Sequence, residues 1–331
     1  MESKKNYSPK IFSKEEIKTI MTDIDNKLFE FIKSGKYQDV LLMMGNLGKY
    51  SLTNQLYILL QKPEATTVKG MKQWNYLGRS IIPGSKSIRI FAPIVETIQQ
   101  EVKDKDGNLL LDEAGNPIVN SKQIVRKYKA SYVFDISQTN GKELEIFKFN
   151  ELTPVDKKET IMQGLLNVVY KQGYSFRYAS EEELGKGCEG MCKYNPKEIL
   201  VKDGMSDLQT ISVLVHECGH ALAHGPYRES FEGLKQLPSR DIREVEAESI
   251  ACVVCSYLGL ETTNYNFSYI SGWANGDIEK FRKNMDVISE CSIKLINGKE
   301  DEMIKDRTKV PKIEHLQAFE PMKVKEGELY L

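Results

Sequence analysis

The sequence His216-Glu217-Cys218-Gly219-His220 lies inside a longer stretch, residues 206–225, that has the apolar periodicity of one amphipathic helix. Ser206 followed three residues later by Gln209 is a capping box, and Gly225 with the proline after it is a stop signal. The chain has four histidines, and three of them fall within residues 216–224. This clustering indicates that the histidines serve a common chemical purpose.

The spacing of the two terminal histidines in this motif suits metal binding. Residues four apart share one face of a helix, so His216 and His220 can direct their rings at a single Zn²⁺ ion. Glu217 lies beside them, where it can accept a proton from metal-bound water. The pattern predicts one catalytic zinc ion, with His216 and His220 as ligands and Glu217 as the catalytic acid/base.

A catalytic zinc site needs a third protein ligand. His224 is a poor candidate, because on the same helix it lies about 12 Å along the axis from His216, and the spacing does not fit the metzincin pattern. A second apolar helix begins at Glu244. We expect Glu244 to be the third ligand and Glu248 to be the carboxylate behind the ligands that accepts a histidine's ring N–H. Glu246 or Glu248 is the alternative ligand.

Length and composition suggest an ordinary cytoplasmic protein. A chain of 331 residues predicts two domains. It contains no apolar run of 18 residues, and its first residues lack the pattern of a signal peptide, so we expect neither a membrane partner nor export. The six cysteines are then expected to be thiols. The residue that stabilises a reaction intermediate is left open among Tyr227, Tyr257 and Tyr265.

Charge is unevenly divided along the chain. Residues 1–95 carry a net charge of +7 and the remainder −8, within a total of −1. Residues 47–94 contain seven Lys or Arg against one Glu, interleaved with Tyr50, Tyr57, Trp74, Tyr76 and Phe91. Cations that follow phosphates and rings that stack on bases are what a single nucleic-acid strand requires. The alternative is a solvated basic face over a core that contains the same rings.

The element pattern predicts an α+β fold. We expect helices at residues 13–33, 37–44, 51–60 and 68–77, strands at 88–94 and 132–136 joined by a charged hairpin, and a linker at 137–151. A helix after Pro154, strands at 174–178 and 199–202, the metal helix, the acidic helix and a long helix at 277–296 should follow. Residues 187–191 or 199–202 are the expected edge strand for an extended peptide.

Several segments resemble a known family. Tyr50-Ser-Leu-Thr-Asn-Gln-Leu56, Lys62-Pro63-Glu64-Ala65-Thr66, Gly70, Trp74, Leu77-Gly78-Arg79, Gly84, Ile88-Arg89-Ile90-Phe91-Ala92-Pro93 and residues 133–139 are similar to the N-terminal single-stranded-DNA-binding domain of ArdC-like antirestriction proteins. The C-terminal half resembles the zincin-like metallopeptidase domain of that family, which is akin to the ImmA/IrrE metallopeptidases. The chain thus looks like an ArdC-like or LtrC-like protein of plasmids and conjugative elements.

The resemblance implies an α/β single-stranded-DNA-binding domain at residues 10–140, a mostly helical metallopeptidase domain with a small sheet at 150–298, and a loose charged tail at 299–331. It places His216, His220 and Glu244 at metal positions and Glu217 at the catalytic position. The DNA contacts are expected from Lys49, Tyr50, Asn54, Lys69, Lys72, Trp74, Arg79, Lys86 and Arg89. The expected function is a gluzincin-type zinc peptidase, acting on a peptide or protein substrate and fused to a DNA-binding domain. The alternative is a non-catalytic DNA-protection protein with a structural or vestigial zinc.

Overall fold

The chain forms two compact units. The computed structural model describes residues 10–103, 108–112, 115–144, 155–225, 238–260, 267 and 278–306. Unit 1 comprises residues 1–24 and 56–142, and unit 2 comprises residues 25–55 and 143–331. Residues 25–55, which we expected within an N-terminal domain of residues 10–140, therefore cluster with the unit that holds the histidine motif. Helices and sheets occur together, which confirms the α+β class.

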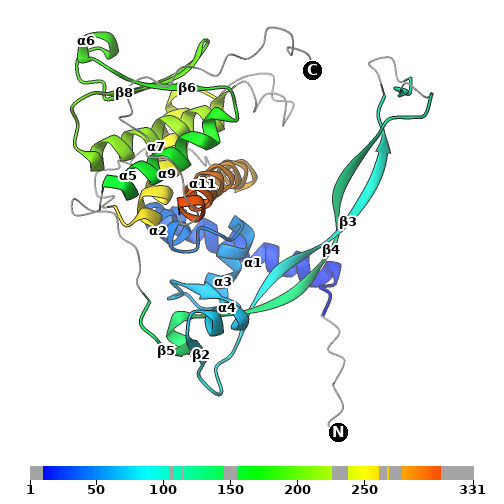
Figure 1. The fold of residues 1–331 in the computed structure, drawn as a ribbon. Coiled ribbons are helices and arrows are strands. Elements are labelled where there is room, and N and C mark those ends of the chain that lie inside the picture. The colour runs from blue at the N-terminus through cyan, green and yellow to red at the C-terminus, as the bar shows by residue number, and fades with distance from the viewer. Residues whose placement is uncertain are drawn as a thin grey trace. The chain divides into compact units, whose positions relative to one another are not determined.

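Unit 1 is built on a long twisted hairpin (Figure 1). β3 (Ile88–Glu101) and β4 (Val119–Asp135) pair antiparallel along their length, with a bulge between Ile94 and Val95. β1 (Val68–Lys69) pairs with the other edge of β4, while β2 (Arg79–Ile81) and β5 (Thr139–Gly141) form a separate two-stranded sheet. Both hairpin strands are longer than the ranges predicted from the sequence. Their outer halves are mostly exposed and carry no apolar alternation, so the sequence pattern did not mark them as strand.

The core of unit 1 lies at the base of the hairpin. Trp74, from α4 (Met71–Tyr76), is fully buried. The ring of Phe91 packs against those of Phe12, Tyr57 and Tyr128, with centroids 4.5, 5.2 and 5.8 Å apart. Aromatic rings of the basic segment, residues 47–94, thus provide much of this core.

Two helices each divide between the units. They are α1 (Lys14–Lys33) and α3 (Leu52–Gln61). A capping box begins α1: the Glu16 N–H donates to Ser13 Oγ at 3.1 Å, and the Ser13 N–H donates to Glu16 Oε2 at 3.0 Å.

Unit 2 combines a small mixed sheet with helices. The sheet has the order β6-β8-β7, in which β6 (Ser175–Ala179) is parallel and β7 (Gly190–Tyr194) antiparallel to β8 (Lys197–Lys202). β8 is central, so the predicted edge at residues 199–202 is wrong, whereas β7, which includes residues 190–191 of the other candidate, is an edge strand. α6 (Glu181–Leu184) lies between β6 and β7 in the chain.

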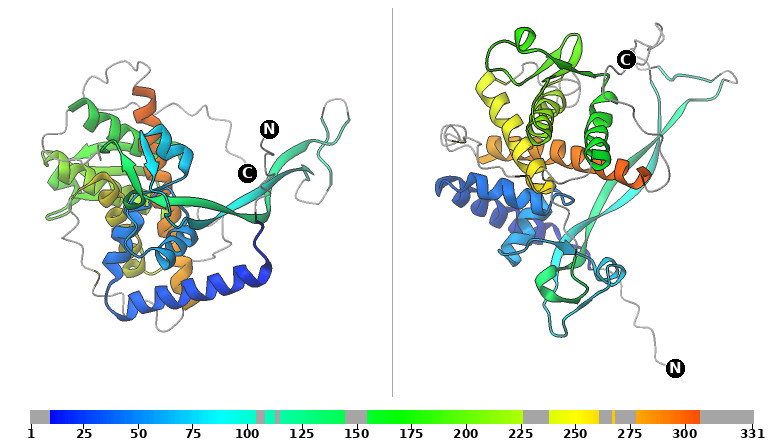
Figure 2. Two further views of the ribbon diagram at one scale, coloured as in Figure 1. Left: turned by 90° about the horizontal axis from the view of Figure 1, so that it is seen from below. Right: turned by 60° about the vertical axis from the view of Figure 1, so that its left-hand side comes forward.

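Five longer helices complete unit 2 within the described residues. They are α2 (Tyr37–Asn46), α5 (Val155–Tyr170), α7 (Asp207–His224), α9 (Arg240–Leu258) and α11 (Ile278–Asp306). α7 packs on β7 and β8, α9 packs on α7, and α2 and α11 pack on α9 (Figure 2). α11 continues ten residues past its predicted end at residue 296, into the segment expected to be a loose tail. The rest of that tail, 307–331, lies outside the described residues, as do residues 145–151 of the predicted linker, whereas residues 139–141 of that linker form β5.

Within the described part of the chain, no helix combines the length and the apolar character needed to cross a membrane.

Candidate metal centre

The helix that carries the histidine motif is fixed at its start and along one face. Ser206 is its N-cap: the Gln209 N–H donates to Ser206 Oγ, and the Ser206 N–H donates to Gln209 Oε1, both at 3.3 Å. The predicted capping box is therefore confirmed. Ile211, Leu214, Val215 and Cys218 are fully buried. This anchored face leaves His216 and Glu217 to line a cavity on the other side.

α7 and α9 approach each other closely beside the motif. A Cβ placed on Gly219 would lie 3.4 Å from Ala247 Cα and 3.5 Å from Ile250 Cβ. Small residues on both helices allow this approach. α9 ends at Leu258, and its C-cap Gly259 adopts the left-handed conformation with φ of 76°.

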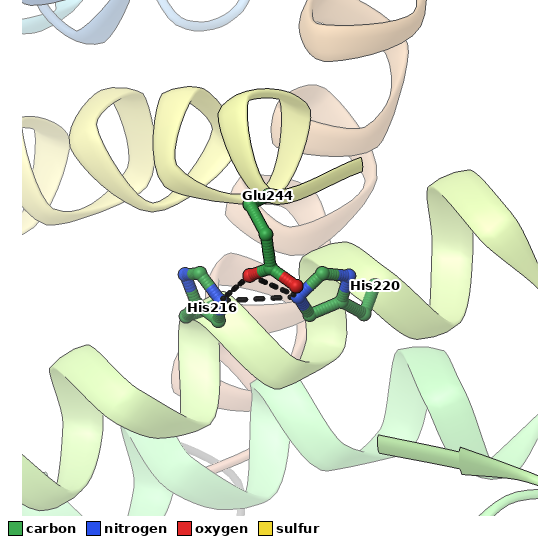
Figure 3. Close-up of side chains that lie close together, drawn as sticks. All are labelled: His216, His220 and Glu244. Carbon is green, nitrogen blue, oxygen red and sulfur yellow. Dashed lines mark hydrogen bonds and ion pairs between the residues drawn. The ribbon is translucent and has the colours of Figure 1, made fainter. Parts of the chain in front are cut away.

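The close approach brings Glu244 of α9 to the two histidines of α7. Figure 3 shows the three side chains pointing toward one another from the two helices. His216 Nε2 and His220 Nε2 are 3.1 Å apart, and Glu244 Oε2 lies 3.6 Å from the first and 3.3 Å from the second. One ligand atom of each residue lies within 4.8 Å of the others. The structure thus brings together the three residues that the sequence predicted as ligands.

These distances fit a bound divalent ion. Ligands about 2.0–2.1 Å from a tetrahedral zinc ion lie roughly 3.3 Å from one another. The three separations of 3.1, 3.3 and 3.6 Å bracket that value. Two imidazoles and one carboxylate are also the donor set of a catalytic zinc site that keeps a position for water.

Electrostatics within the cluster favour a charged carboxylate. The neighbouring His216 and His220 imidazoles hold the pKa of Glu244 far below its ordinary value. Burial lowers the pKa of His216, but the hydrogen bond with Glu244 and the nearby Glu217 and Glu248 carboxylates outweigh burial and raise it. The acidic surroundings of these rings are suited to a cation.

Behind the cluster lies a buried relay that differs from our expectation. His220 Nδ1 is 3.2 Å from His224 Nδ1, and His224 Nε2 is 2.7 Å from Glu246 Oε2. His224 and Glu246 are both buried. If His220 binds a metal through Nε2, its Nδ1–H can donate to His224, which in turn donates to Glu246. His224 lies behind His220 in the interior and is not among the three clustered residues.

The role predicted for Glu248, as acceptor of a ligand's ring N–H, is therefore wrong for His220, because His224 occupies the position beside Nδ1. Glu248 is half-buried, and burial raises its pKa. Its influence on the centre is a Coulombic effect on His216. The sequence spacing pointed to Glu248, four residues after Glu244. In the structure the outer carboxylate is that of Glu246, two residues after Glu244, on the side of α9 that faces His224.

Glu217 is held between α7 and the edge strand. Its side chain is buried, which raises its pKa, and the Cys192 backbone N–H of β7 donates a hydrogen bond to it. A Cβ on Gly190 would lie 2.8 Å from Glu217 Oε1, 2.9 Å from its Cγ and 2.5 Å from Val213 Cγ1. Gly190 therefore leaves the room in which this carboxylate sits.

The cluster opens on a cavity of about 610 Å³. Its lining includes two residues that sequence reasoning missed, Tyr194 at the end of β7 and Arg243 on α9. Neither belongs to a spacing motif, so no sequence signal marked them. Of the tyrosines left open as candidates, Tyr227 and Tyr265 lie outside the described residues, and Tyr257 is about 20 Å from Glu244 along α9.

The basic segment contains residues with structural roles. Trp74 is fully buried and donates its ring N–H to the Phe134 carbonyl at 2.9 Å, so the prediction that it stacks on DNA is wrong. Arg79 donates to Thr139 Oγ1 at 2.7 Å and to the Lys142 carbonyl at 2.6 Å, where it ties β2 to β5. These contacts use the side chains that composition alone suggested for nucleic acid.

The other predicted DNA contacts divide between the units. Lys49, Tyr50 and Asn54 belong to unit 2, and Asn54 is buried. In unit 1, Lys72 and Lys86 are exposed, while Lys69 and Arg89 are half-buried. The sequence pattern also included Tyr76, and this ring is 91% exposed. It lies at a shallow hollow of about 310 Å³ lined by Lys69, Lys72, Gln73, Tyr76 and Leu77.

Together these observations define an α+β protein with a two-histidine, one-glutamate group suited to a divalent ion. Residues 14–134 match the family model described as the N-terminal domain of anti-restriction factor ArdC. Residues 14–134 are thus similar to the ArdC N-terminal domain, in the segment where the sequence resemblance was found.

Individual relatives are distant. An uncharacterised protein of Bacillus anthracis is 26% identical over 322 residues, which cover 89% of this chain and 53% of that protein. The chain thus spans about half the length of this relative. Crystal structures of the antirestriction ArdC protein from the R388 plasmid, metal-free and Mn(II)-bound, are 15% identical with a TM-score of 0.45, covering 84% of this chain and 97% of theirs. At that similarity the chemistry must be argued from this chain's own residues.

Proposed function

We propose that unit 2 is a gluzincin-type zinc metallopeptidase and that unit 1 binds single-stranded DNA. In this proposal His216, His220 and Glu244 hold the zinc ion and Glu217 is the catalytic acid/base. The ArdC-like N-terminal domain supports an antirestriction or DNA-protection role, as for a protein of a plasmid or conjugative element. The six free cysteines suit a reducing compartment such as the cytoplasm.

The observation that carries the peptidase proposal is the position of Glu217 beside the three-residue cluster and the edge strand. Zinc bound there supplies an activated water and polarises a carbonyl. Glu217 lines the same cavity and can take the proton of that water and pass it to the leaving amine. β7 offers an edge along which an extended peptide can lie.

The test is hydrolysis by the zinc-loaded chain. Glu217→Gln keeps the shape of the side chain and removes the proton acceptor, so we expect zinc content to stay at one per chain and cleavage of an unstructured protein such as casein to fall about 10²–10⁴-fold. Glu290→Gln, an exposed change on α11, is the matched control. Undiminished cleavage by the Glu217→Gln variant, or a wild type that takes up no zinc, would overturn the proposal.

The DNA-binding proposal is carried by the exposed Tyr76 ring beside Lys69 and Lys72. A base can stack on such a ring for about 1–3 kcal/mol, while the ammonium groups attract phosphates. We expect a labelled oligo-dT to bind with an affinity that falls steeply with salt. Tyr76→Ala should weaken binding about 5- to 150-fold, and Tyr76→Phe should retain it.

The salt dependence should separate these two contributions. Lys72→Gln should reduce the slope of log affinity against log salt by about 0.7, whereas Tyr76→Ala should leave that slope unchanged. Binding that ignores ionic strength would refute the electrostatic part of the proposal.

The second candidate function is a DNA-protection protein whose zinc is structural or vestigial. The exposed Tyr76 site supports it independently of any hydrolysis. Protection of incoming DNA from restriction in cells decides between the two, with wild type compared with Glu217→Gln and Tyr76→Ala. Protection that survives in the first variant and is lost in the second supports the non-catalytic function.

A further inference from the structure

The cavity beside the metal centre contains a cationic corner that the hydrolytic chemistry leaves unused. Arg243 immediately precedes Glu244 on α9, and both line the cavity. Tyr194, at the end of the edge strand, also lines this cavity, and the nearby Arg243 counteracts the burial that raises the pKa of Tyr194. The end of β7 and the start of α9 therefore both contribute to the cavity wall that contains Arg243, beside the candidate metal centre.

The guanidinium is incompletely satisfied by the protein. Arg243 Nε is buried and has no hydrogen-bond partner among the described residues. Arg240, one turn earlier, is 84% exposed, and its Nε lies 4.0 Å from Glu244 Oε1 at the rim. Arg243 is thus the inner cation and Arg240 the outer one.

Charge in the cavity also favours an anionic ligand once a divalent ion is bound. Arg240, Arg243 and the ion contribute four positive charges, and the acidic residues of the lining, Glu189, Glu217 and Glu244, contribute three negative ones. The lining and the ion together therefore carry a net charge of +1. A planar guanidinium matches a carboxylate in geometry as well as charge.

We propose that Arg243, positioned by Tyr194, is a subsite that binds a carboxylate of the substrate peptide, either an acidic side chain or a free C-terminus. The subsite selects substrate and takes no part in proton transfer. This inference rests on the proposed peptidase function, because the same cavity serves both.

Matched hydroxamates provide the test, since a hydroxamate binds zinc and carries its substituent into the cavity. The probes are acetohydroxamate and the monohydroxamates of succinate, glutarate and adipate, each compared with its primary amide. Binding to the zinc-loaded full chain is measured by calorimetry. In wild type we expect the preferred acid to bind about 10-fold or more tightly than its amide, in line with a charge-assisted hydrogen bond.

The variants separate recognition from structural support. Arg243→Gln should reduce the acid-to-amide ratio to below about 3, Arg243→Lys should restore part of it, and Tyr194→Phe should lower it moderately, because one charge-assisted contact is lost or weakened. Arg240→Gln, at the rim, should leave most of the ratio. Acetohydroxamate should bind wild type and every variant equally, which also shows that they fold.

Failure of this inference and failure of the proposed function give different patterns. Equal binding of acid and amide to wild type, or a ratio that survives Arg243→Gln, overturns the carboxylate subsite while acetohydroxamate still binds. No binding of acetohydroxamate to zinc-loaded wild type overturns the metal centre and the subsite with it. Cleavage of internal Glu against Gln peptides, and of free against amidated C-termini, then identifies the source of the carboxylate.

Discussion

The metal cluster of unit 2 and the basic segment of unit 1 were both predicted from local sequence, with different outcomes. In unit 2 the structure brings His216, His220 and Glu244 together as predicted. In unit 1 Trp74 and Arg79, assigned to DNA, hold the fold together instead. The i, i+4 spacing on a helix fixes where side chains point. Composition fixes neither exposure nor partner, because the same rings and cations can build a core or a binding surface.

The strongest test of this contrast is to remove one member of the cluster. His220→Ala removes one of the three proposed ligands and also breaks the contact with His224. We expect zinc affinity to fall by more than about 100-fold, the upper end of the effect of losing an outer-shell partner. Competition with a chromophoric chelator measures this. The exposed Glu290→Gln change is the control, and unchanged zinc affinity in the His220→Ala variant would contradict the cluster.

A smaller change tests the room left for Glu217. Gly190→Ala places a Cβ within 3 Å of the Glu217 carboxylate and of Val213, so the carboxylate has to move. A displacement of about 1 Å at a catalytic group can reduce the rate roughly 100-fold. We expect hydrolysis to fall by that order while zinc content stays at one per chain. Parallel loss of zinc would show instead that the substitution disturbs α7 as a whole.

The outer carboxylate can be assigned by comparing two neighbouring acids. Glu246→Gln weakens the acceptor behind His224 and should lower zinc affinity about 10- to 100-fold. Glu248→Gln should have a smaller effect, because its influence is Coulombic. The same chelator competition measures both variants. The reverse order of effects would restore Glu248 to the role first predicted for it.

The contrast between Glu246 and Glu248 shows which features of the site could be predicted from the sequence. Helix caps, the i, i+4 ligands and the position of Cys218 follow from one helix and could be predicted. The His224–Glu246 relay depends on the rotation of α9 against α7, which is set by the close approach at Gly219 and Ala247. Tyr194 and Arg243 meet only because β7 is an edge strand beside the start of α9. The grouping of residues 25–55 with unit 2 likewise depends on packing between distant segments.

Residues 133–139 are one of the segments that resemble the family, and within them Asp135 has a structural role. Asp135 is buried, and its carboxylate accepts backbone N–H groups of Thr66, Thr67 and Ser137 at 2.8, 3.1 and 2.9 Å. It thereby joins the end of β4 to the segment before β1. Asp135→Asn places an amide N–H₂ opposite one of these donors, so we expect a loss of about 1–3 kcal/mol in the free energy of unfolding.

The pH dependence of that loss is the control that distinguishes charge from shape. Burial raises the pKa of Asp135, but the hydrogen bonds outweigh burial and leave it below its ordinary value. A carboxyl whose pKa is depressed in the folded state stabilises above its unfolded pKa of about 3.9, and that stabilisation is lost as pH falls through the folded pKa. The difference in free energy of unfolding between wild type and Asp135→Asn is measured by urea unfolding, with hydrogen exchange reporting unit 1. This difference should therefore be constant near neutrality and narrow below about pH 4.

Asp112→Asn changes an exposed carboxylate that accepts an N–H from Asn116, and it should differ little from wild type in free energy of unfolding at any pH. A gap for Asp135→Asn that persists through acidification would mean that shape, and not charge, maintains this junction.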